Sequence, residues 1–421
     1  MIKWHIKRTI LSVSSPHPKK MHKGSLVPLF GKNLQQNSWR AFWEKSPLKS
    51  FLFSKSLPLV LLLIILLLYF QFPLNLFGPS DGTDFGRIIS NGTFLAKFVD
   101  FQKRYFMSKR QTFLSSFSKN YSTIEEKLRR FSIFVANFEQ LEKIGREGEV
   151  YGITTFFDWS DEELKELIMP HEYFESVPFS WAKPIREFRP MDANFKRPSE
   201  FDWRKKGVVN HVKNQMRCGA CWAFATAAVV ESQHAIHNGT LLTLSEQQMI
   251  DCDQSNNGCE GGNRPNAFRY VRDNGLLRED NYPYRGADGN CELSPGPVDP
   301  TQRTFVDEVR TLPSDEQQIA DFVVEKGPVS FGMNVTKTMF HYVGGIFSPT
   351  ADECQFHSMG RHAMEVVGFG EDEKSGGTPF WIMKNSWGSS WGINGGYMHI
   401  RRGVDACGLS REVHTALITR Y

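Results

Sequence analysis

All seven cysteines of this 421-residue chain lie beyond residue 217. Clustered cysteines are typical of disulfide-bonded domains, which fold in oxidising compartments. Because their number is odd, we expect three disulfides and one free thiol that is a candidate for reactivity. Four Asn-X-Ser/Thr sequons also lie beyond residue 90, and each is a candidate glycosylation site in such a compartment: Asn91, Asn120, Asn238 and Asn334. These features predict that most of the chain folds in a lumen or outside the cell.

The N-terminal segment predicts a membrane anchor. Residues 1–55 hold eleven Lys or Arg against one acid, Glu44, and we expect them to form a mostly disordered cytosolic tail. Residues 56–77 carry no charge and reach the length of about 20 residues that spans a bilayer. Since the basic excess precedes this segment, the positive-inside rule predicts a type II signal anchor with the remaining chain in the lumen. A cleaved signal peptide is the alternative, because the densest apolar core, Leu59 to Phe70, is short.

The length of the chain limits its number of structural units, and its charge limits the functions that it fits. A chain of 421 residues indicates two or three structural units. The net charge of +4 is small, and the basic excess lies in the tail, so the remaining chain is slightly acidic. A nucleic-acid-binding domain would itself be basic, which disfavours that function. Residues 78–110 carry no recognisable chemistry, and we interpret them as a stem.

One cysteine stands at the start of a predicted helix. Cys221 precedes an alanine-rich run that predicts a helix ending near Asn238-Gly239. A thiol at a helix N-terminus meets unpaired N–H groups and the positive end of the helix dipole, and both favour the thiolate. Gln215, six residues earlier, offers a side-chain amide that is able to turn back towards the same sulfur. The local sequence therefore predicts an activated cysteine with an amide donor for an oxyanion.

Three segments of the chain resemble the papain and cathepsin family of cysteine proteases. Cys218-Gly-Ala-Cys221-Trp fits the signature around that family's nucleophile. His362 opens an apolar pattern that predicts a buried strand, and it is similar to the family's His-Ala strand. Asn385 lies in Trp-Ile-Met-Lys-Asn-Ser-Trp-Gly, which is a highly specific match.

The resemblance implies a role for each of these residues. Cys221 would be the nucleophile, His362 its base and Asn385 the group that orients the imidazole. The amide of Gln215 and the Cys221 backbone N–H would hold the oxyanion, and Trp387 would shield the hydrogen bond between histidine and asparagine from water. The implied activity is that of a cysteine endopeptidase acting on peptides and proteins through a thioester acyl-enzyme. We expect no metal, no cofactor and a monomer.

A helical segment before the peptidase resembles the family's inhibitory propeptide. One helix face would carry four residues at the spacing of the family's propeptide motif: Glu126, Arg130, Phe134 and Asn137. A second propeptide motif follows in residues 152–158. We therefore predict an inhibitory propeptide at 111–196, with a proline-containing linker from residue 169, and a peptidase domain at 197–421. Acidic propeptide residues such as Asp158 and Glu163 suggest activation by acid, in a lysosome or a related acidic compartment or after secretion.

The resemblance also implies the fold and the cross-links. We expect an α+β, two-lobed papain-like fold, in which a helical lobe carries the nucleophile and a β-barrel-like lobe carries the base. The implied disulfides are Cys218–Cys259, Cys252–Cys291 and Cys354–Cys407, which leave Cys221 free.

The same family resemblance also implies which residues bind the substrate. A glycine-rich wall would bind an extended peptide, and a pocket beside it would take a substrate side chain; the residues implied are Gly261, Gly262, Asn263, Arg264, Gly332, Gly360, Ala363, Trp387 and Glu412. Arg264 and Glu412 depart from the family's apolar pattern. They are interpreted as an ion pair, as a preference for a polar substrate side chain, or as two solvated charges. Arg361 also departs from the pattern, and a cation at this position should disfavour the imidazolium of His362.

Other classes remain as alternatives. Cys218 and Cys221 also form a C-x-x-C motif, so a thiol–disulfide oxidoreductase is one alternative. Zinc binding through Cys218, Cys221, Cys252 and Cys259 is another. A catalytically silent papain-fold binding protein is a third. The first two explain neither the surroundings of His362 and Asn385 nor the propeptide-like helix.

Overall fold

The computed structural model describes residues 107–144, 150–171, 183–192, 194–293 and 299–419. By internal contacts the chain divides into residues 1–81 and 82–421, and every described residue belongs to the second unit. The predicted tail, the predicted anchor and Asn91 lie outside the described residues. Among the residues that are described, no helix combines the length and apolar character needed to cross a bilayer.

The propeptide segment is built on one long amphipathic helix. Helix α7 (Ile124–Ile144) is preceded by a helix over residues 107–116 and followed by the short helix α8 (Asp161–Lys165). Phe134 is 1% exposed and packs against Phe113 and Phe157, each with its ring centroid 5.2 Å away. The predicted face of α7 thus forms the core of this segment.

An ionic network on the same helix joins α7 to α8. Arg130 Nε lies 2.6 Å from Glu126 Oε1, as the i,i+4 spacing predicts, and Arg130 Nη1 lies 2.6 Å from Glu163 Oε2. Glu163 also completes the capping box of α8 with Ser160.

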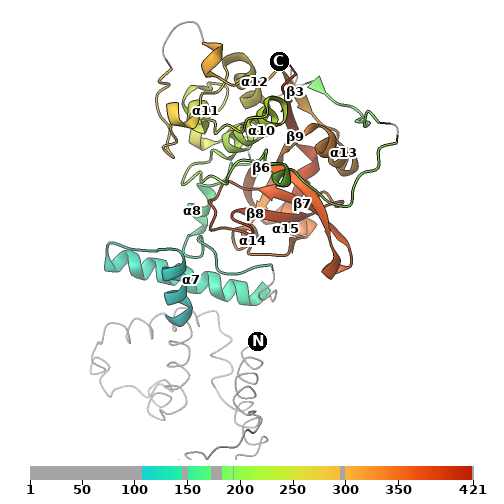
Figure 1. Ribbon diagram of the computed structural model, residues 1–421. Helices are drawn as coiled ribbons and strands as arrows, with labels where there is room; N and C mark the ends of the chain where they lie inside the picture. Colours follow the sequence, from blue (N-terminus) through green and yellow to red (C-terminus); the bar gives the residue numbers. More distant parts are fainter. Residues whose placement is uncertain (1–106, 145–149, 172–182, 193, 294–298, 420–421) are drawn as a thin grey trace, which may run out of the picture. The chain divides into compact units, whose positions relative to one another are not determined.

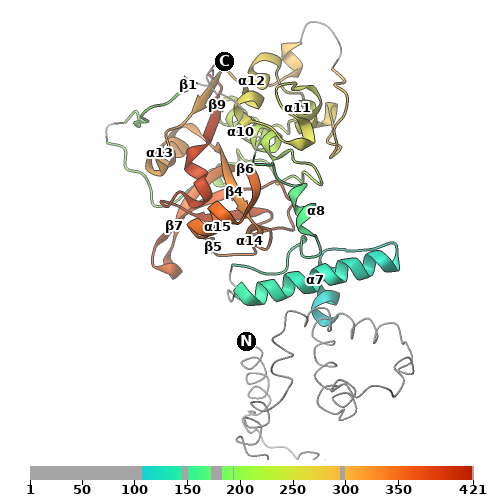
Figure 2. The ribbon, with the colours of Figure 1, turned by 180° about the vertical axis from the view of Figure 1, so that it is seen from behind.

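In the part of the chain that the structure describes, the helices of the helical lobe lie together (Figures 1 and 2). They are α10 (Cys221–Asn238), α11 (Glu246–Cys252) and α12 (Arg264–Asn274). Helix α10 is buried along most of its length and ends at Gly239, whose φ of 72° is the left-handed conformation that favours glycine at a helix C-terminus. The sequence-based prediction for this helix is therefore confirmed at both ends.

The second lobe is a mainly antiparallel sheet. In the described residues it has nine strands, in the order β1-β3-β9-β4-β6-β7-β8-β5, with β2 paired to β6. The strands are β1 (Lys183–Pro184), β2 (Phe201–Asp202), β3 (Glu308–Thr311), β4 (Val329–Thr336), β5 (Ile346–Phe347), β6 (Ser358–Asp372), β7 (Thr378–Lys384), β8 (Tyr397–Arg401) and β9 (Val413–Leu417). The α-helices of this lobe are α13 (Glu316–Lys326), α14 (Lys337–Phe340) and α15 (Ala351–Phe356). Short 3-10 helices also occur: η2 (Trp203–Lys206), η3 (Gly258–Glu260), η4 (Glu279–Asn281), η5 (Pro300–Gln302), η6 (Glu373–Ser375) and η7 (Ala406–Arg411). The division into a helical and a sheet lobe confirms the predicted α+β class.

The disulfides tie loops within these lobes. The structure contains Cys218–Cys259, Cys252–Cys291 and Cys354–Cys407, the same pairs that the resemblance implies. Cys221 is left as the free cysteine, and it is buried. Each bridge closes a loop of 39 to 53 residues, which corresponds to about 4 kcal/mol of stabilisation in the chain-entropy picture.

The described sequons differ in accessibility. Asn120 and Asn238 are exposed, so both are accessible to glycosylation, although a glycan on Asn238 would displace the 3.2 Å contact of its Nδ2 with His234 Nε2. Asn334 lies half-buried in β4, and its amide donates to the carbonyl of Cys354 at 3.1 Å. Glycosylation at Asn334 would break this bond, so the structure disfavours that site.

We predict that Phe134→Ala loosens the propeptide. Truncating a buried phenylalanine costs about 3–5 kcal/mol, so local opening of α7 should become at least about a hundredfold more frequent. Cleavage of α7 by an added protease, with Cys221 changed to Ser so that the predicted nucleophile cannot act, measures this opening. Ile124→Ala, at a side chain 58% exposed in the same helix, is the matched control. Equal cleavage rates for both variants would contradict the core assigned to Phe134.

Candidate active site

Helix α10 presents the Cys221 thiol at its first turn. The backbone N–H groups of Ala363, Trp222 and Cys221 itself face the sulfur and favour its ionised form, but the side chain is fully buried and burial outweighs them. Burial raises the pKa of the Cys221 thiol to about 12. The expected resting thiolate is therefore not the favoured state while the thiol is covered.

Strand β6 carries His362 directly before Ala363, whose backbone N–H faces this thiol. The ring's Nε2 donates to Asn385 Oδ1 at 2.7 Å, and the ring of Trp387 lies over it with a centroid separation of 4.6 Å. Nδ1 is buried and has no hydrogen-bond partner within the described part of the chain. A proton on Nε2 leaves Nδ1 as the atom that is able to accept a proton from a thiol.

Burial also sets the charge of His362. It lowers the pKa of the imidazole to about 4, against an opposing effect of the Asn385 hydrogen bond and with a further lowering by the nearby cation of Arg264. The cation beside the base is thus Arg264 rather than Arg361, whose guanidinium is directed to Glu412 at 2.5 Å. The covered site holds a neutral thiol and a neutral imidazole.

Gln215 holds a propeptide carbonyl. Its Nε2 donates to the carbonyl oxygen of Leu167 at 3.0 Å and to that of Cys218 at 2.8 Å. Its Oε1 accepts from the Ser386 hydroxyl at 2.6 Å, which fixes the orientation of the amide. The donor predicted for an oxyanion is therefore occupied by a peptide carbonyl.

Two residues after Leu167, the propeptide continues along β6 and contacts Gly262. Met169 pairs with Arg361 through two backbone hydrogen bonds of 2.8 Å, and its sulfur accepts from Gly262 N–H at 3.5 Å. A Cβ on Gly360 would lie 2.6 Å from the Met169 carbonyl, so this close approach requires glycine. Residue 169, predicted as the first residue of a linker, instead lies bound in the site. Sequence reasoning missed this because the segment 167–169 shows only an ordinary apolar pattern.

The charged residues near this surface form a connected group. Arg264 is 1% exposed, and its Nη2 donates to the Glu412 carbonyl at 2.9 Å and lies 3.4 Å from Glu412 Oε2. Glu412 Oε1 lies 2.5 Å from Arg361 Nη2. The interpretation of Arg264 and Glu412 as an ion pair is therefore confirmed, and their interpretation as two solvated charges is wrong. A Cβ on Gly332 would lie 2.5 Å from Arg264 Nη1, so that glycine makes room for the guanidinium.

Comparison with known proteins agrees with this geometry. Residues 197–417 match the papain family cysteine protease model, and residues 111–164 match the cathepsin propeptide inhibitor domain (I29). The chain is 37% identical to pro-cathepsin H of Bos taurus over 312 residues, covering 71% of this chain and 87% of that protein. It is 34% identical to cathepsin F of Mus musculus over 311 residues, covering 73% and 64%. The structure of the digestive procathepsin L2 proteinase from Tenebrio molitor larval midgut superposes with a TM-score of 0.65 at 32% identity, over 74% of this chain and 100% of that one.

The chain belongs to the papain family of cysteine proteases. It is made as a proenzyme with an inhibitory propeptide, and its predicted papain-like fold is confirmed. The two thiol-based alternatives are wrong. Cys218, Cys252 and Cys259 are all in disulfides, so they neither form a zinc site with Cys221 nor leave Cys218 free to pair with it. No group of three or more metal-ligating side chains occurs among the described residues.

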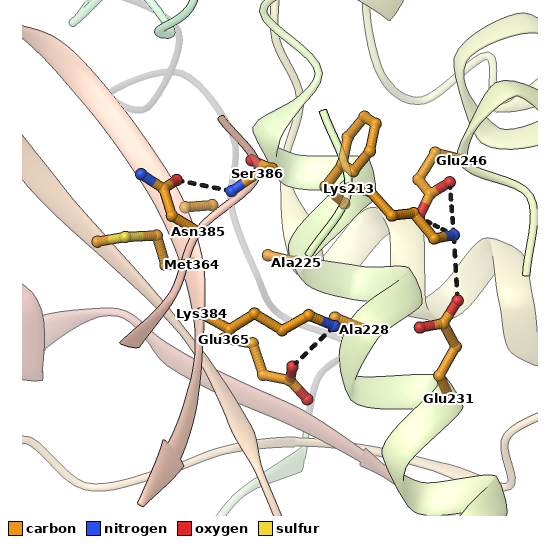
Figure 3. Close-up of a pocket in the computed structure, with 12 residues that line it drawn as sticks. Lys213, Ala225, Ala228, Glu231, Glu246, Met364, Glu365, Lys384, Asn385 and Ser386 are labelled. Atoms are coloured by element: carbon orange, nitrogen blue, oxygen red, sulfur yellow. Dashed lines mark hydrogen bonds and ion pairs between the residues drawn. The ribbon is translucent and has the colours of Figure 1, made fainter. Parts of the chain in front are cut away.

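Buried ion pairs of this papain-family protease hold the segments that carry the site. Figure 3 shows a pocket between α10, the middle of β6 and the end of β7, in which Lys213 is directed to Glu246 and Lys384 to Glu365. The nitrogen–oxygen distances of these two pairs are 2.8 Å and 3.6 Å. Lys384 immediately precedes Asn385, and Lys213 lies two residues before Gln215. Burial raises the pKa of Glu246 to about 7, while the charge of Lys213 opposes this shift.

A second contact between propeptide and peptidase surrounds His341. The His341 carbonyl accepts from Gly152 N–H at 2.8 Å, and the ring lies 5.0 Å from that of Phe157. Its two ring nitrogens are buried, and no described residue forms a hydrogen bond with them. Burial lowers the pKa of His341 to about 3, with Lys337 lowering it further and Asp161 opposing. Lys337 and Asp161 also pair directly across this contact at 2.6 Å.

Glu163, by contrast, is already held in its charged form. Burial alone would raise its pKa, but hydrogen bonds from Arg130, the Ser160 backbone and Arg217 lower it well below the usual range. Stability that depends on ionised Glu163 is present above its unfolded pKa of about 4.3 and is lost only as the pH falls through the depressed value. Glu163 therefore stays charged in a moderately acidic compartment.

We predict that protonation of His341 weakens propeptide binding in acid. Its pKa is about 3 when covered and about 6.5 when exposed. The contribution of the neutral buried ring to propeptide binding is therefore complete above pH ~6.5. Between pH ~6.5 and ~3, the equilibrium constant for the closed state falls by up to about tenfold per pH unit. Hydrogen exchange of residues 150–159 in the Cys221→Ser proenzyme, corrected for intrinsic rates, should lose up to about a hundredfold of its protection between pH 6.5 and 4.5. His341→Leu should remove most of this loss.

The control for this prediction is His357→Leu, because His357 is exposed and is the cap residue that directly follows α15. It should behave as the parent proenzyme. Identical pH dependence in the parent and His341→Leu would contradict the role given to His341.

Proposed function

We propose that this protease is an endopeptidase whose nucleophile is Cys221, with His362 as its base, Asn385 as the orienting group and Gln215 as an oxyanion donor. The observation that carries the proposal is the Leu167 carbonyl bound to the Gln215 amide at 3.0 Å. A peptide carbonyl thus lies on the predicted oxyanion donor, with the next residues running along β6. An extended substrate is expected to use the same surface once the propeptide has left.

The chemistry follows from the geometry of these groups. When the propeptide leaves, water enters the cleft and the burial that favours neutral Cys221 and His362 is reduced. The thiol proton then passes to His362 Nδ1, and the thiolate attacks the scissile carbonyl. The Gln215 amide and the Cys221 N–H stabilise the resulting oxyanion. The imidazolium gives its proton to the leaving amine, which departs and leaves a thioester on Cys221.

Hydrolysis of the thioester completes the cycle. Neutral His362 takes a proton from water, whose oxygen attacks the thioester carbonyl. The tetrahedral intermediate collapses to release a carboxylic acid and the Cys221 thiolate. Asn385 keeps the ring oriented in both halves of the reaction through its 2.7 Å hydrogen bond, and Trp387 covers that bond. The substrate itself would lie along Gly261, Gly262, Asn263, Arg264, Gly332, Gly360, Ala363 and Glu412.

The proposed path of the chain in the cell combines the sequence features outside the described residues. Residues 56–77 would anchor a type II membrane precursor, residues 78–110 would form its stem, and residues 111–196 would keep the peptidase at 197–421 inactive. The peptidase would act as a monomer in the lumen of a lysosome or a related acidic compartment, or after secretion. The placement of all disulfide cysteines and sequons after the apolar segment supports this orientation.

We predict that Cys221→Ser abolishes peptide hydrolysis and labelling by an epoxysuccinyl inhibitor. Gln215→Ala should lower kcat by about 10²–10³, since it removes one oxyanion donor. Steady-state hydrolysis of a peptide substrate by the processed enzyme, together with mass spectrometry of the labelled residue, provides the measurement. Gln302→Ala, at an exposed glutamine, is the matched control and should retain full activity. A processed protein that binds peptides but cleaves none would instead be the silent papain-fold binding protein.

We predict that the complete chain remains in the membrane after carbonate extraction, whereas a chain beginning at residue 78 is extracted. The apolar segment 56–77 is long enough to span, and loss of about 20 apolar residues removes the anchor. Fractionation followed by N-terminal mass spectrometry of the retained protein gives the result. An N-terminus just after the apolar segment in newly made protein would show a cleaved signal peptide instead.

A further inference from the structure

Arg264 is a buried cation that its protein neighbours satisfy only in part. It begins α12, directly after Asn263, and its guanidinium is 1% exposed. Only Nη2 donates, to the carbonyl and the carboxylate of Glu412. Nε and Nη1 are buried and have no acceptor among the residues that the structure describes. These two nitrogens carry three N–H groups between them, and burying them unpaired is costly.

The charges around Arg264 do not cancel. Among the described residues, Glu412 is the acid that pairs with Arg264, at 3.4 Å, and it also pairs with Arg361, at 2.5 Å. Two cations therefore face one carboxylate. Two buried histidines also lie close by, His362 and His414, and burial together with Arg264 lowers the pKa of both. Both rings are neutral, so the group keeps a net charge of +1 from its two arginines and one glutamate.

Arg264 lies within reach of a bound peptide. Gly332 pairs with Ala363 in the β4–β6 register, and a Cβ on Gly332 would meet the guanidinium, so Arg264 fills the space in front of the residue next to His362. Gly262, two residues before Arg264, binds the side chain of Met169, whose backbone pairs with Arg361. Within the described residues, the propeptide brings the thioether of Met169 to this wall, and Nε and Nη1 of Arg264 have no acceptor there.

We propose that this pocket selects peptide substrates that carry an acidic side chain at the residue next to the reacting one, with Arg264 as the residue that binds the carboxylate. The proposal rests on the proposed endopeptidase activity and adds its substrate class. A carboxylate supplies acceptors to the unpaired N–H groups and balances the residual charge, and hydrogen bonds of this kind between ions are the stronger ones in proteins. Glu412 would hold Arg264 in place and keep Arg361 from competing for the substrate.

The test compares four peptides that differ only at the second residue before the cleaved bond: Glu, Gln, Leu and Arg. At pH 6 we expect kcat/KM for the glutamyl peptide to exceed that for the arginyl peptide by at least about tenfold, and to exceed that for the leucyl and glutaminyl peptides by several-fold. Between pH 6 and 4 the ratio of glutamyl to glutaminyl hydrolysis should fall towards one, because the substrate carboxyl has a pKa of about 4.3. This part of the test needs no variant and no assumption about folding.

Two variants then move the preference in opposite directions. Arg264→Met should lower the ratio of glutamyl to leucyl hydrolysis by at least about tenfold. Glu412→Gln removes the competing anion and should raise the same ratio. Titration with the epoxysuccinyl inhibitor gives the concentration of active sites for each protein, so that rates are compared per active site. A structural role alone for Arg264 would lower hydrolysis of all four peptides together.

The outcomes separate the two proposals. Best hydrolysis of the arginyl peptide would mean that Glu412 recognises the substrate, and best hydrolysis of the leucyl peptide with the glutamyl peptide poorest would mean an apolar pocket; either overturns this inference while leaving the endopeptidase intact. Absence of both labelling at Cys221 and hydrolysis of every peptide would overturn the endopeptidase itself.

Discussion

Exclusion of water from the Cys221 thiol and the His362 ring determines the charge of both side chains in the proenzyme. In the proposed catalytic pair a thiolate on Cys221 and an imidazolium on His362 would stabilise each other, yet burial favours the neutral form of both side chains. The segment around Met169 supplies part of that burial, because it is itself fully buried against the site. Inhibition by the propeptide is therefore electrostatic as well as steric. Removing the propeptide both opens the path for a substrate and restores the solvent that an ion pair needs.

The site is precise because each of its groups is fixed by a contact outside the chemistry. Ser386 and the Leu167 carbonyl hold the two ends of the Gln215 amide. Lys213 and Lys384 form ion pairs with buried glutamates. Lys213 lies two residues before Gln215, and Lys384 lies directly before Asn385. An active site assembled from residues more than a hundred positions apart in sequence depends on such anchors, since a small displacement of a donor or base removes much of its effect.

The sequence was sufficient for local features and insufficient for contacts between distant segments. The start and end of α10, the face of α7 that holds Phe134, and the α+β class all follow from short-range patterns and the family resemblance. The occupation of the Gln215 amide by Leu167 did not follow, because nothing in residues 167–169 distinguishes a bound segment from a linker. The burial of His341 and of Arg264 was equally invisible, since a single histidine or arginine is more often solvated and only the packed fold removes it from water.

In our proposal, Arg264 affects which substrate side chain is bound but has little net effect on formation of the thiolate–imidazolium pair. A cation favours the thiolate of Cys221 and disfavours the imidazolium of His362, and Arg264 has both effects. The thiolate–imidazolium pair carries no net charge, so these two effects oppose each other in its formation and largely cancel. A carboxylate bound at Arg264 would weaken both together and leave the balance nearly unchanged. Under our proposal, the residue at this position would set which substrate side chain is bound without deciding whether the Cys221 thiolate forms, and access of water to the site would decide the latter.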